Sequence, residues 1–418
     1  MSQPAPNPPA IVVGLDCITG LQTARILAGH DIPVFGIASD LDHFCCRTRV
    51  CQQILQADVN TSDFVSLLQE LGPALPQKGV LFPCTDMSVL LLSRNRDQLD
   101  AWYHIILPEI EVVEMLMDKL SFLTYAQNAG LPIPTTVQLN SRKEAEAAAN
   151  RLPYPCVVKP SIKSARWQAA KLDKAYLAGS AEELLALYDR CAPHVDMLIA
   201  QEWVAGTEGD LYSCNCYFNA DNEPLVAFVA RKIRQWPPQT GTSSLGVEVQ
   251  DDQVRQISLE LFQRAGYRGL GYVEVKRDPD SGRYYIIEPN IGRPTGRSSI
   301  AEAGGVALLY TMYCDALGRP LPANRQQQYR GAKWIYWRHD FQSALHYWRQ
   351  GQLSMGNWWR SWRGRKACAV FSWTDPGPFV TDVGRIAAQV LGVRKKKARF
   401  RLASLATEEA SKRLSPGS

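Results

Sequence analysis

Short apolar runs alternate with amphipathic segments along most of the chain, as is typical of proteins that mix strands and helices. Residues 10–15 are apolar, a turn bounded by Gly20 follows, and residues 21–28 and 32–38 have the patterns of a helix and a second strand. This order predicts a βαβ unit with a parallel sheet. Because the turn lacks the Gly-x-Gly-x-x-Gly pattern, we interpret the unit as a scaffold or substrate lobe, with dinucleotide binding as the alternative.

The alternation continues to residue 316. We expect further strands over 78–84, 105–107, 154–159, 198–204, 211–218 and 225–233, and helices over 88–99, 118–129, 180–191, 252–265 and 298–316. Asp86 follows one of these strands, in the position where open α/β sheets bind ligands, and capping of the next helix is the alternative role.

Residues 268–293 read as two strands around a tight turn, and we interpret them as the segment around which the chain is organised. Asp, Pro, Ser and Gly over 278–282 are turn residues, and aromatic and β-branched residues flank them. With the turn near Asp280, antiparallel pairing brings Glu274 diagonally close to Glu288, and Asn290 shares a face with Glu288. Such oxygen ligands suit Mg²⁺, and a surface hairpin with solvated charges is the alternative.

The overall composition is that of a soluble globular protein with several domains. Of the 418 residues, 46% are hydrophobic and 21% charged, and no apolar run reaches the ~18 residues of a membrane-spanning helix. The first ten residues lack the basic and apolar regions of a secretory signal. The 11 cysteines show no zinc-finger spacing, so we expect reduced thiols, with metal ligation or a catalytic thiol as alternatives.

The last part of the chain differs from the rest in charge and aromatic content. Residues 325–418 hold 18 Lys/Arg against 5 Asp/Glu, and 7 of the 11 tryptophans. Helical spacing is seen for Phe341, Leu345 and Trp348, and a second short helix carries Trp358, Trp359 and Trp362.

Three roles remain open for this basic, tryptophan-rich part. It can be a helical cap packed on the core or on a dimer partner, or an interfacial segment on anionic lipid. Its composition also permits nucleic-acid binding, although no nucleic-acid-binding motif is present. The basic run at 394–401 would strengthen any anionic contact.

The order of the candidate residues is more specific than any one of them. A lysine at a helix start, a lysine at a strand end, an acidic turn and a basic strand end all precede the hairpin. The segments DKLSFLTYAQNAGLPIP, YPCVVKP, AQEWVAGTEGDLY, RKIRQWPP, GYVEVKRD and IIEPN resemble the ATP-grasp superfamily, particularly its carboxylate–amine ligase and carbamoyl-phosphate-synthase-like branches. The resemblance covers residues 10–325.

The resemblance implies a fold that combines α/β and α+β parts. It places a Rossmann-like, pre-ATP-grasp lobe at residues 1–115 and an ATP-grasp domain at 116–325, with two lobes and a hinge near 200–206. Residues 326–418 would form a mainly helical, Trp/Arg-rich C-terminal module.

The resemblance also implies roles for single residues. The phosphates of ATP would contact Lys119 and Lys159, adenine would meet Gln201, Glu202, Trp203 and Val204, and the ribose hydroxyls would bind Glu208 or Asp210. Mg²⁺, with Mn²⁺ as an alternative ion, would be held by Glu274, Glu288 and Asn290. An acyl phosphate would be stabilised by the catalytic residues Arg293, Arg231, Lys232 and Arg234. Cations at these places are needed because phosphoryl transfer requires neutralisation of the charge on ATP.

Two features depart from the family pattern. The loop at 161–170 has no glycine, so its closure over ATP is open, and Lys163 and Arg166 are candidates to replace backbone N–H groups as phosphate contacts. The arginine after Asn290 is displaced by one residue, so Arg293 and Arg297 are both candidates.

We therefore predict a cytoplasmic, Mg-dependent ligase that joins a small-molecule carboxylate to an amine and releases ADP and phosphate. Amino-acid-like or cell-envelope precursors are the expected substrates. The alternative is a catalytically silent ATP-binding protein whose C-terminal module recruits a partner or a membrane. A homodimer, and a peripheral contact of 326–418 with the anionic inner face of the membrane, are further candidate associations, whereas a nucleic-acid partner is not expected.

Overall fold

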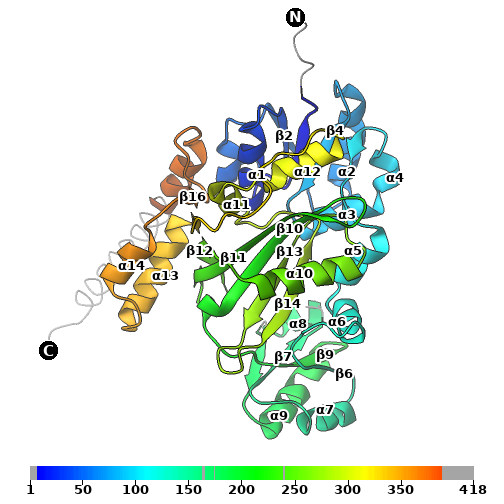
Figure 1. The fold of residues 1–418 in the computed structure, drawn as a ribbon. Helices are drawn as coiled ribbons and strands as arrows, with labels where there is room; N and C mark the ends of the chain where they lie inside the picture. The colour runs from blue at the N-terminus through cyan, green and yellow to red at the C-terminus, as the bar shows by residue number, and fades with distance from the viewer. Residues whose placement is uncertain (1–6, 162–164, 174, 239–240, 388–418) are drawn as a thin grey trace, which may run out of the picture.

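The computed structural model describes residues 7–161, 165–173, 175–238 and 241–387 (Figure 1). Lys163 and the basic run at 394–401, both singled out in the sequence, lie outside the described residues.

A five-stranded parallel sheet forms the N-terminal lobe, with strand order β3-β2-β1-β4-β5. Its strands are β1 (Ala10–Val13), β2 (Val34–Ala38), β3 (Gln53–Gln56), β4 (Gly79–Pro83) and β5 (Tyr103–His104); the helices are α1 (Ile18–Ala28), α2 (Asp63–Leu71), α3 (Asp86–Arg94), α4 (Arg96–Leu99) and α5 (Ile110–Met117), with 3₁₀ turns at Phe44–Arg47 and Gly72–Ala74. The parallel pairing of β1 and β2 across α1 confirms the predicted βαβ unit. A Cβ at Gly20 would lie 2.2 Å from the oxygen of Gly14, so this close turn requires glycine.

A small antiparallel sheet follows, with strand order β6-β9-β7-β8. It contains β6 (Thr136–Leu139), β7 (Cys156–Pro160), β8 (Tyr176–Ala178) and β9 (Leu198–Glu202), together with α6 (Lys119–Asn128), α7 (Arg142–Ala149), α8 (Ala165–Ala169), α9 (Ala181–Cys191) and a 3₁₀ turn at Ala192–His194. Trp167 and Leu184 lie in its own apolar core, so this lobe packs as a unit.

The largest sheet has seven strands in the order β14-β13-β10-β11-β12-β15-β16. They are β10 (Leu211–Phe218), β11 (Pro224–Trp236), β12 (Thr242–Glu248), β13 (Gly269–Arg277), β14 (Tyr284–Ile291), β15 (Lys333–Ile335) and β16 (Lys366–Cys368); the associated helices are η4 (Glu208–Asp210), α10 (Asp252–Arg264), α11 (Ser299–Gly304), α12 (Leu308–Ala316), α13 (Trp337–Arg349) and α14 (Met355–Ser361). Because β15 and β16 join the sheet, it extends across residue 325.

The two faces of this sheet have different coverings. On one face Cys214 and Val273 pack against α10, which lies across β10 and β13 (Figure 1). Side chains alternate between faces along a strand, so Glu274 points to the other face, where Phe228 packs against α11 and the N-terminal lobe. The predicted site residues of the hairpin therefore face towards the N-terminal lobe.

Several predicted element boundaries are wrong. The strand expected over 105–107 lies at Tyr103–His104, and the helix expected over 88–99 begins at Asp86 and is broken at Asn95. The helix expected over 298–316 is two helices, because Gly305 ends the first in the left-handed region with φ of 87°. The division of the chain at residues 115 and 325 stays a prediction.

Candidate active site

A register shift in the β13–β14 hairpin sets the position of its acidic residues. Val275 pairs with Ile286, but the next pair is Glu274 with Glu288, so Ile287 forms a bulge. The diagonal contact expected from the sequence is therefore corrected to a direct one. Residues directly opposite each other have Cβ atoms about 4.5–5.5 Å apart, and like charges there are destabilising unless a cation compensates them.

Arg293 connects Asn290 to the surroundings of the hairpin. Asn290 lies two residues beyond Glu288, and its Oδ1 accepts a 2.8 Å hydrogen bond from Arg293 Nη2. Arg293 Nη1 donates to the hydroxyl of Tyr272 at 3.2 Å, and Nε forms an ion pair with Asp86 at the start of α3. The structure thus brings the predicted amide and arginine together, and it joins the hairpin to the N-terminal lobe.

Two further cations lie near the acidic pair. Burial lowers the pKa of Lys232, and the nearby carboxylates of Glu274 and Glu288 act in the opposite direction. Arg297, the other candidate for the displaced arginine, lies 3.8 Å from Glu274 Oε1. Negative charge that develops beside the hairpin would therefore meet cations on β11 and on the segment after β14.

The predicted basic cluster on β11 does not form. Arg231 pairs with Tyr212 of β10 and is exposed on the face opposite to Lys232. Arg234 is buried and bonded to Asp340, with Nε to Oδ1 at 2.8 Å and Nη2 to Oδ2 at 2.9 Å. Of the three residues, Lys232 alone is directed towards the acidic pair.

The predicted adenine segment begins in the last two residues of β9 and is held by two lysines. Lys159 Nζ donates to Gln201 Oε1 at 2.9 Å. On the other side of the segment, Lys276 Nζ donates to the carbonyl of Val204 at 2.8 Å and lies 5.0 Å from the ring centre of Trp203. Since Lys276 belongs to β13, it ties this segment to the strand that carries Glu274.

Glu202 has a local role in the structure. Its backbone N–H donates to the carbonyl of Thr135 at 2.8 Å, and its side-chain Oε2 accepts from the N–H of Thr135 at 3.0 Å. The residue is thereby fixed to the strand entry before β6.

Glu208 and Asp210, the two candidates for the ribose, differ in their contacts. Asp210 Oδ2 accepts from the backbone N–H and the hydroxyl of Thr207 at 2.7 and 2.9 Å, which is helix capping. Glu208 Oε2 accepts from the backbone N–H of Gln235 at 3.0 Å, and Oε1 accepts from the hydroxyl of Tyr347 at 2.6 Å. Glu208 is the one directed to β11, so its contacts favour Glu208 over Asp210 as the residue that binds ribose.

The other residues predicted to contact phosphate make no contact with the hairpin among the described residues. Lys119 is exposed at the first position of α6. Arg166 is paired with Asp196.

The donor set at the hairpin fits a magnesium ion bound together with ATP. Glu274 and Glu288 lie directly opposite each other and supply carboxylate oxygens. The Nδ2 of Asn290 is buried without a hydrogen-bond partner among the described residues and is a donor for a phosphate oxygen. Within those residues no three His, Cys, Asp or Glu side chains are placed to hold a metal. The other ligands would therefore be phosphate oxygens and water, which Mg²⁺ commonly retains.

Sequence analysis did not identify three residues that contact the predicted site residues: Lys276, Gln235 and Tyr347. Lys276 could have been found, because it lies two residues after Glu274 and so on the same face of β13. Nothing in the sequence connects Tyr347 with Glu208, from which it is separated by 139 residues.

The chain resembles two curated proteins over different lengths. No family model matches it. It is 28% identical over 221 residues to the carbamoyl phosphate synthase large chain of Hyperthermus butylicus, covering 50% of this chain but 20% of that protein. It is 22% identical over 305 residues to D-aspartate ligase of Enterococcus faecium, covering 66% of this chain and 72% of that protein.

A solved structure shares the fold. The biotin carboxylase domain of 2-oxoglutarate carboxylase from Hydrogenobacter thermophilus superposes with a TM-score of 0.56 at 14% identity, covering 76% of this chain and 71% of that one. That structure is a dimer in complex with MgADP, ADP and bicarbonate. Binding of magnesium and adenine nucleotide therefore occurs on this fold.

Proposed function

Because the chain belongs to the ATP-grasp superfamily, we propose that it is a Mg-dependent ligase that joins a carboxylate to an amine. A substrate carboxylate oxygen attacks the γ-phosphorus of ATP, giving an acyl phosphate and ADP. The amine nitrogen then attacks the acyl carbon, phosphate leaves, and the nitrogen loses a proton to give the amide. The observation that carries this proposal is the direct opposition of Glu274 and Glu288.

We assign roles to the chain's own residues in this reaction. Glu274, Glu288 and Asn290 would hold Mg²⁺, which when bound screens the charge of the phosphates. Arg293, Arg297 and Lys232 would stabilise the acyl phosphate and the charge that develops on its carbonyl oxygen, since fixed cations in a partly buried site act strongly on such charge.

No feature of the described residues favours the alternative, a catalytically silent ATP-binding protein. Amino-acid-like substrates are favoured by the similarity to a D-aspartate ligase. Use of Mn²⁺ and formation of a homodimer stay predictions.

Contact of 326–418 with an anionic membrane also stays a prediction. Phe341, Trp348 and Trp359 are 57%, 51% and 61% exposed, beside the exposed Arg360 and Arg363. In the described part of the chain, no helix has both the length and the apolar character needed to cross a bilayer. Trp359→Ala should weaken sedimentation with anionic vesicles if this surface binds lipid, and unchanged sedimentation would count against lipid contact.

The test of the ligase proposal is ADP formation with Mg-ATP against pooled carboxylates and pooled amines. Wild type should require both pools, and Glu288→Gln should abolish turnover while the melting temperature stays within a few degrees. Asp280→Asn, an exposed change at the tip of the same hairpin, serves as the control and should keep full activity. Undiminished turnover by Glu288→Gln would contradict the metal assignment.

A further inference from the structure

The C-terminal module reaches the nucleotide side of the site through one side chain. Tyr347, near the end of α13, donates its hydroxyl to Glu208 Oε1 at 2.6 Å. The other oxygen of this carboxylate accepts from the backbone N–H of Gln235 on β11 at 3.0 Å. The carboxylate is thus oriented by donors from two elements, α13 and β11.

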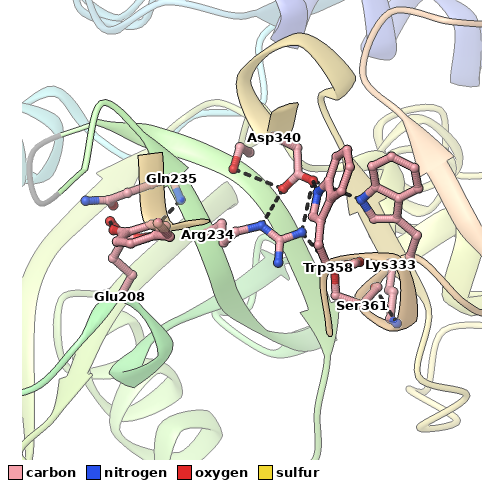
Figure 2. A network of polar contacts seen from close by, with 10 residues as sticks. Glu208, Arg234, Gln235, Lys333, Asp340, Trp358 and Ser361 are labelled. Carbon is pink, nitrogen blue, oxygen red and sulfur yellow. Dashed lines mark hydrogen bonds and ion pairs between the residues drawn. The ribbon is translucent and has the colours of Figure 1, made fainter. Parts of the chain in front are cut away.

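The helix that carries Tyr347 is itself fixed to the same stretch of β11. Asp340 lies seven residues before Tyr347, two turns away on the same side of α13. Its carboxylate is completely buried and pairs with Arg234, the neighbour of Gln235 in the sequence (Figure 2). One end of this face of α13 therefore holds Arg234 directly, and the other end reaches the adjacent Gln235 through Glu208.

Indole and hydroxyl donors complete the anchor. Asp340 Oδ2 accepts from Trp358 Nε1 at 3.0 Å and from Trp362 Nε1 at 2.9 Å, and Arg234 Nη2 also donates to Ser361 at 2.9 Å. Two of the tryptophans that set this module apart in the sequence are therefore used to lock α13 in place. His346 adds an edge-to-face contact with Trp236, with ring centres 6.2 Å apart.

Tyr347 stays a hydrogen-bond donor at neutral pH. Burial and the hydrogen bond to Glu208 both raise its pKa above the ordinary value. The contact is therefore a neutral phenol donating to a carboxylate, which is among the stronger types of hydrogen bond.

We propose that Tyr347 is a positioning residue that orients Glu208 towards the ribose hydroxyls of a bound nucleoside triphosphate. The C-terminal module is then a part of the nucleotide site as well as a cap. This inference rests on the proposed function, in which Glu208 binds ribose, and it adds a contribution from a region outside the 10–325 segment that resembles the superfamily.

The experiment compares the binding of ATP with that of 2′,3′-dideoxy-ATP by calorimetry in the full chain. Tyr347→Phe removes one oxygen atom and should weaken ATP binding about 3- to 10-fold, the effect of one hydrogen bond, while leaving the affinity for the dideoxy analogue unchanged. Tyr284→Phe is the matched control, because it removes a tyrosine–carboxylate bond of 2.8 Å to Asp251 on the other face of the sheet. It should change neither affinity.

A second variant guards against a purely structural effect. Glu208→Gln should lose the same discrimination between the two nucleotides, and combining it with Tyr347→Phe should add no further loss, because both changes act on one contact. If Tyr347→Phe weakens the binding of both nucleotides equally, or weakens the binding of neither, the positioning role is overturned. Absence of ATP binding by wild type would instead overturn the proposed function, and this inference with it.

Discussion

The seven-stranded sheet carries two acidic sites that are built in opposite ways. At Asp340 one carboxylate is completely buried, and a guanidinium and two indoles satisfy it. At the hairpin, two carboxylates oppose each other, Glu288 is exposed, and Arg297 lies 3.8 Å from Glu274. The first site is closed to solvent, whereas the second is open to something that binds.

This difference separates stability from function. A buried charge with a full set of partners is costly to disturb, because removal of one partner leaves the other uncompensated. Opposed carboxylates at a half-exposed position offer oxygen ligands to a cation that binds. Substitutions at the closed site should therefore change stability, whereas substitutions at the hairpin should change binding.

The largest effect on stability is expected at the closed site. Asp340→Asn leaves the guanidinium of Arg234 buried without a counter-charge and should destabilise the protein by about 3–5 kcal/mol. Urea unfolding followed by tryptophan fluorescence measures this change. Glu114→Gln, which removes the exposed ion pair Arg94–Glu114, serves as the control. If Asp340→Asn costs less stability than this control, Asp340 is not an anchor.

The next largest effect concerns pH and Glu302 on α11. Burial raises the pKa of Glu302 from 4.5 to about 7, so the folded protein holds this proton more tightly than the unfolded chain. The associated stability is present below pH 4.5 and is lost as the pH rises through 7, by about 1–3 kcal/mol. Glu302→Gln should flatten the stability profile between pH 5 and 8, and an unaltered slope would refute the assignment.

A smaller effect should distinguish the adjacent tryptophans of α14. Trp358 is 8% exposed and donates to Asp340, whereas Trp359 is 61% exposed. Trp358→Phe should cost about 1–2 kcal/mol through the lost hydrogen bond to a charged acceptor, and Trp359→Phe should stay within about 0.5 kcal/mol. Similar costs for the two variants would mean that the helix does not pack as described.

The smallest effect belongs to the open site. Glu288→Gln changes an exposed side chain, so without Mg²⁺ it should alter the free energy of unfolding by no more than about 0.5 kcal/mol. Differential scanning calorimetry in a chelator reports this change. Destabilisation by more than about 1 kcal/mol under these conditions would mean that Glu288 mainly holds the hairpin together rather than a ligand.

The local sequence pattern was sufficient to predict the hairpin and the parallel N-terminal sheet. Turn residues and alternation place β13 and β14 correctly. The direct opposition of Glu274 and Glu288 could not be predicted, because it depends on a bulge at Ile287 that local pattern does not reveal. The basic run on β11 was misjudged for a different reason: neighbours in a strand, such as Arg231 and Lys232, point to opposite faces, and this could have been inferred from the sequence.

The C-terminal helices show the limit of hydrophobic periodicity. Phe341 and Trp348 form the apolar stripe of α13, yet both are about half exposed, and the buried residues of that helix are Asp340, Ser343 and Ala344. The polar face is buried because Arg234 on β11 meets it, a partner 106 residues away. Sequence periodicity alone cannot identify a pairing over such a distance.

The central claim is that the opposed carboxylates of the hairpin hold the magnesium that accompanies ATP. The most direct test is calorimetric titration of ATP, with and without Mg²⁺, into wild type and into the Glu274→Gln/Glu288→Gln double variant. We predict that Mg²⁺ tightens ATP binding at least tenfold in wild type and little in the double variant. Equal tightening in both proteins would contradict the claim, because the metal would then be held by other residues.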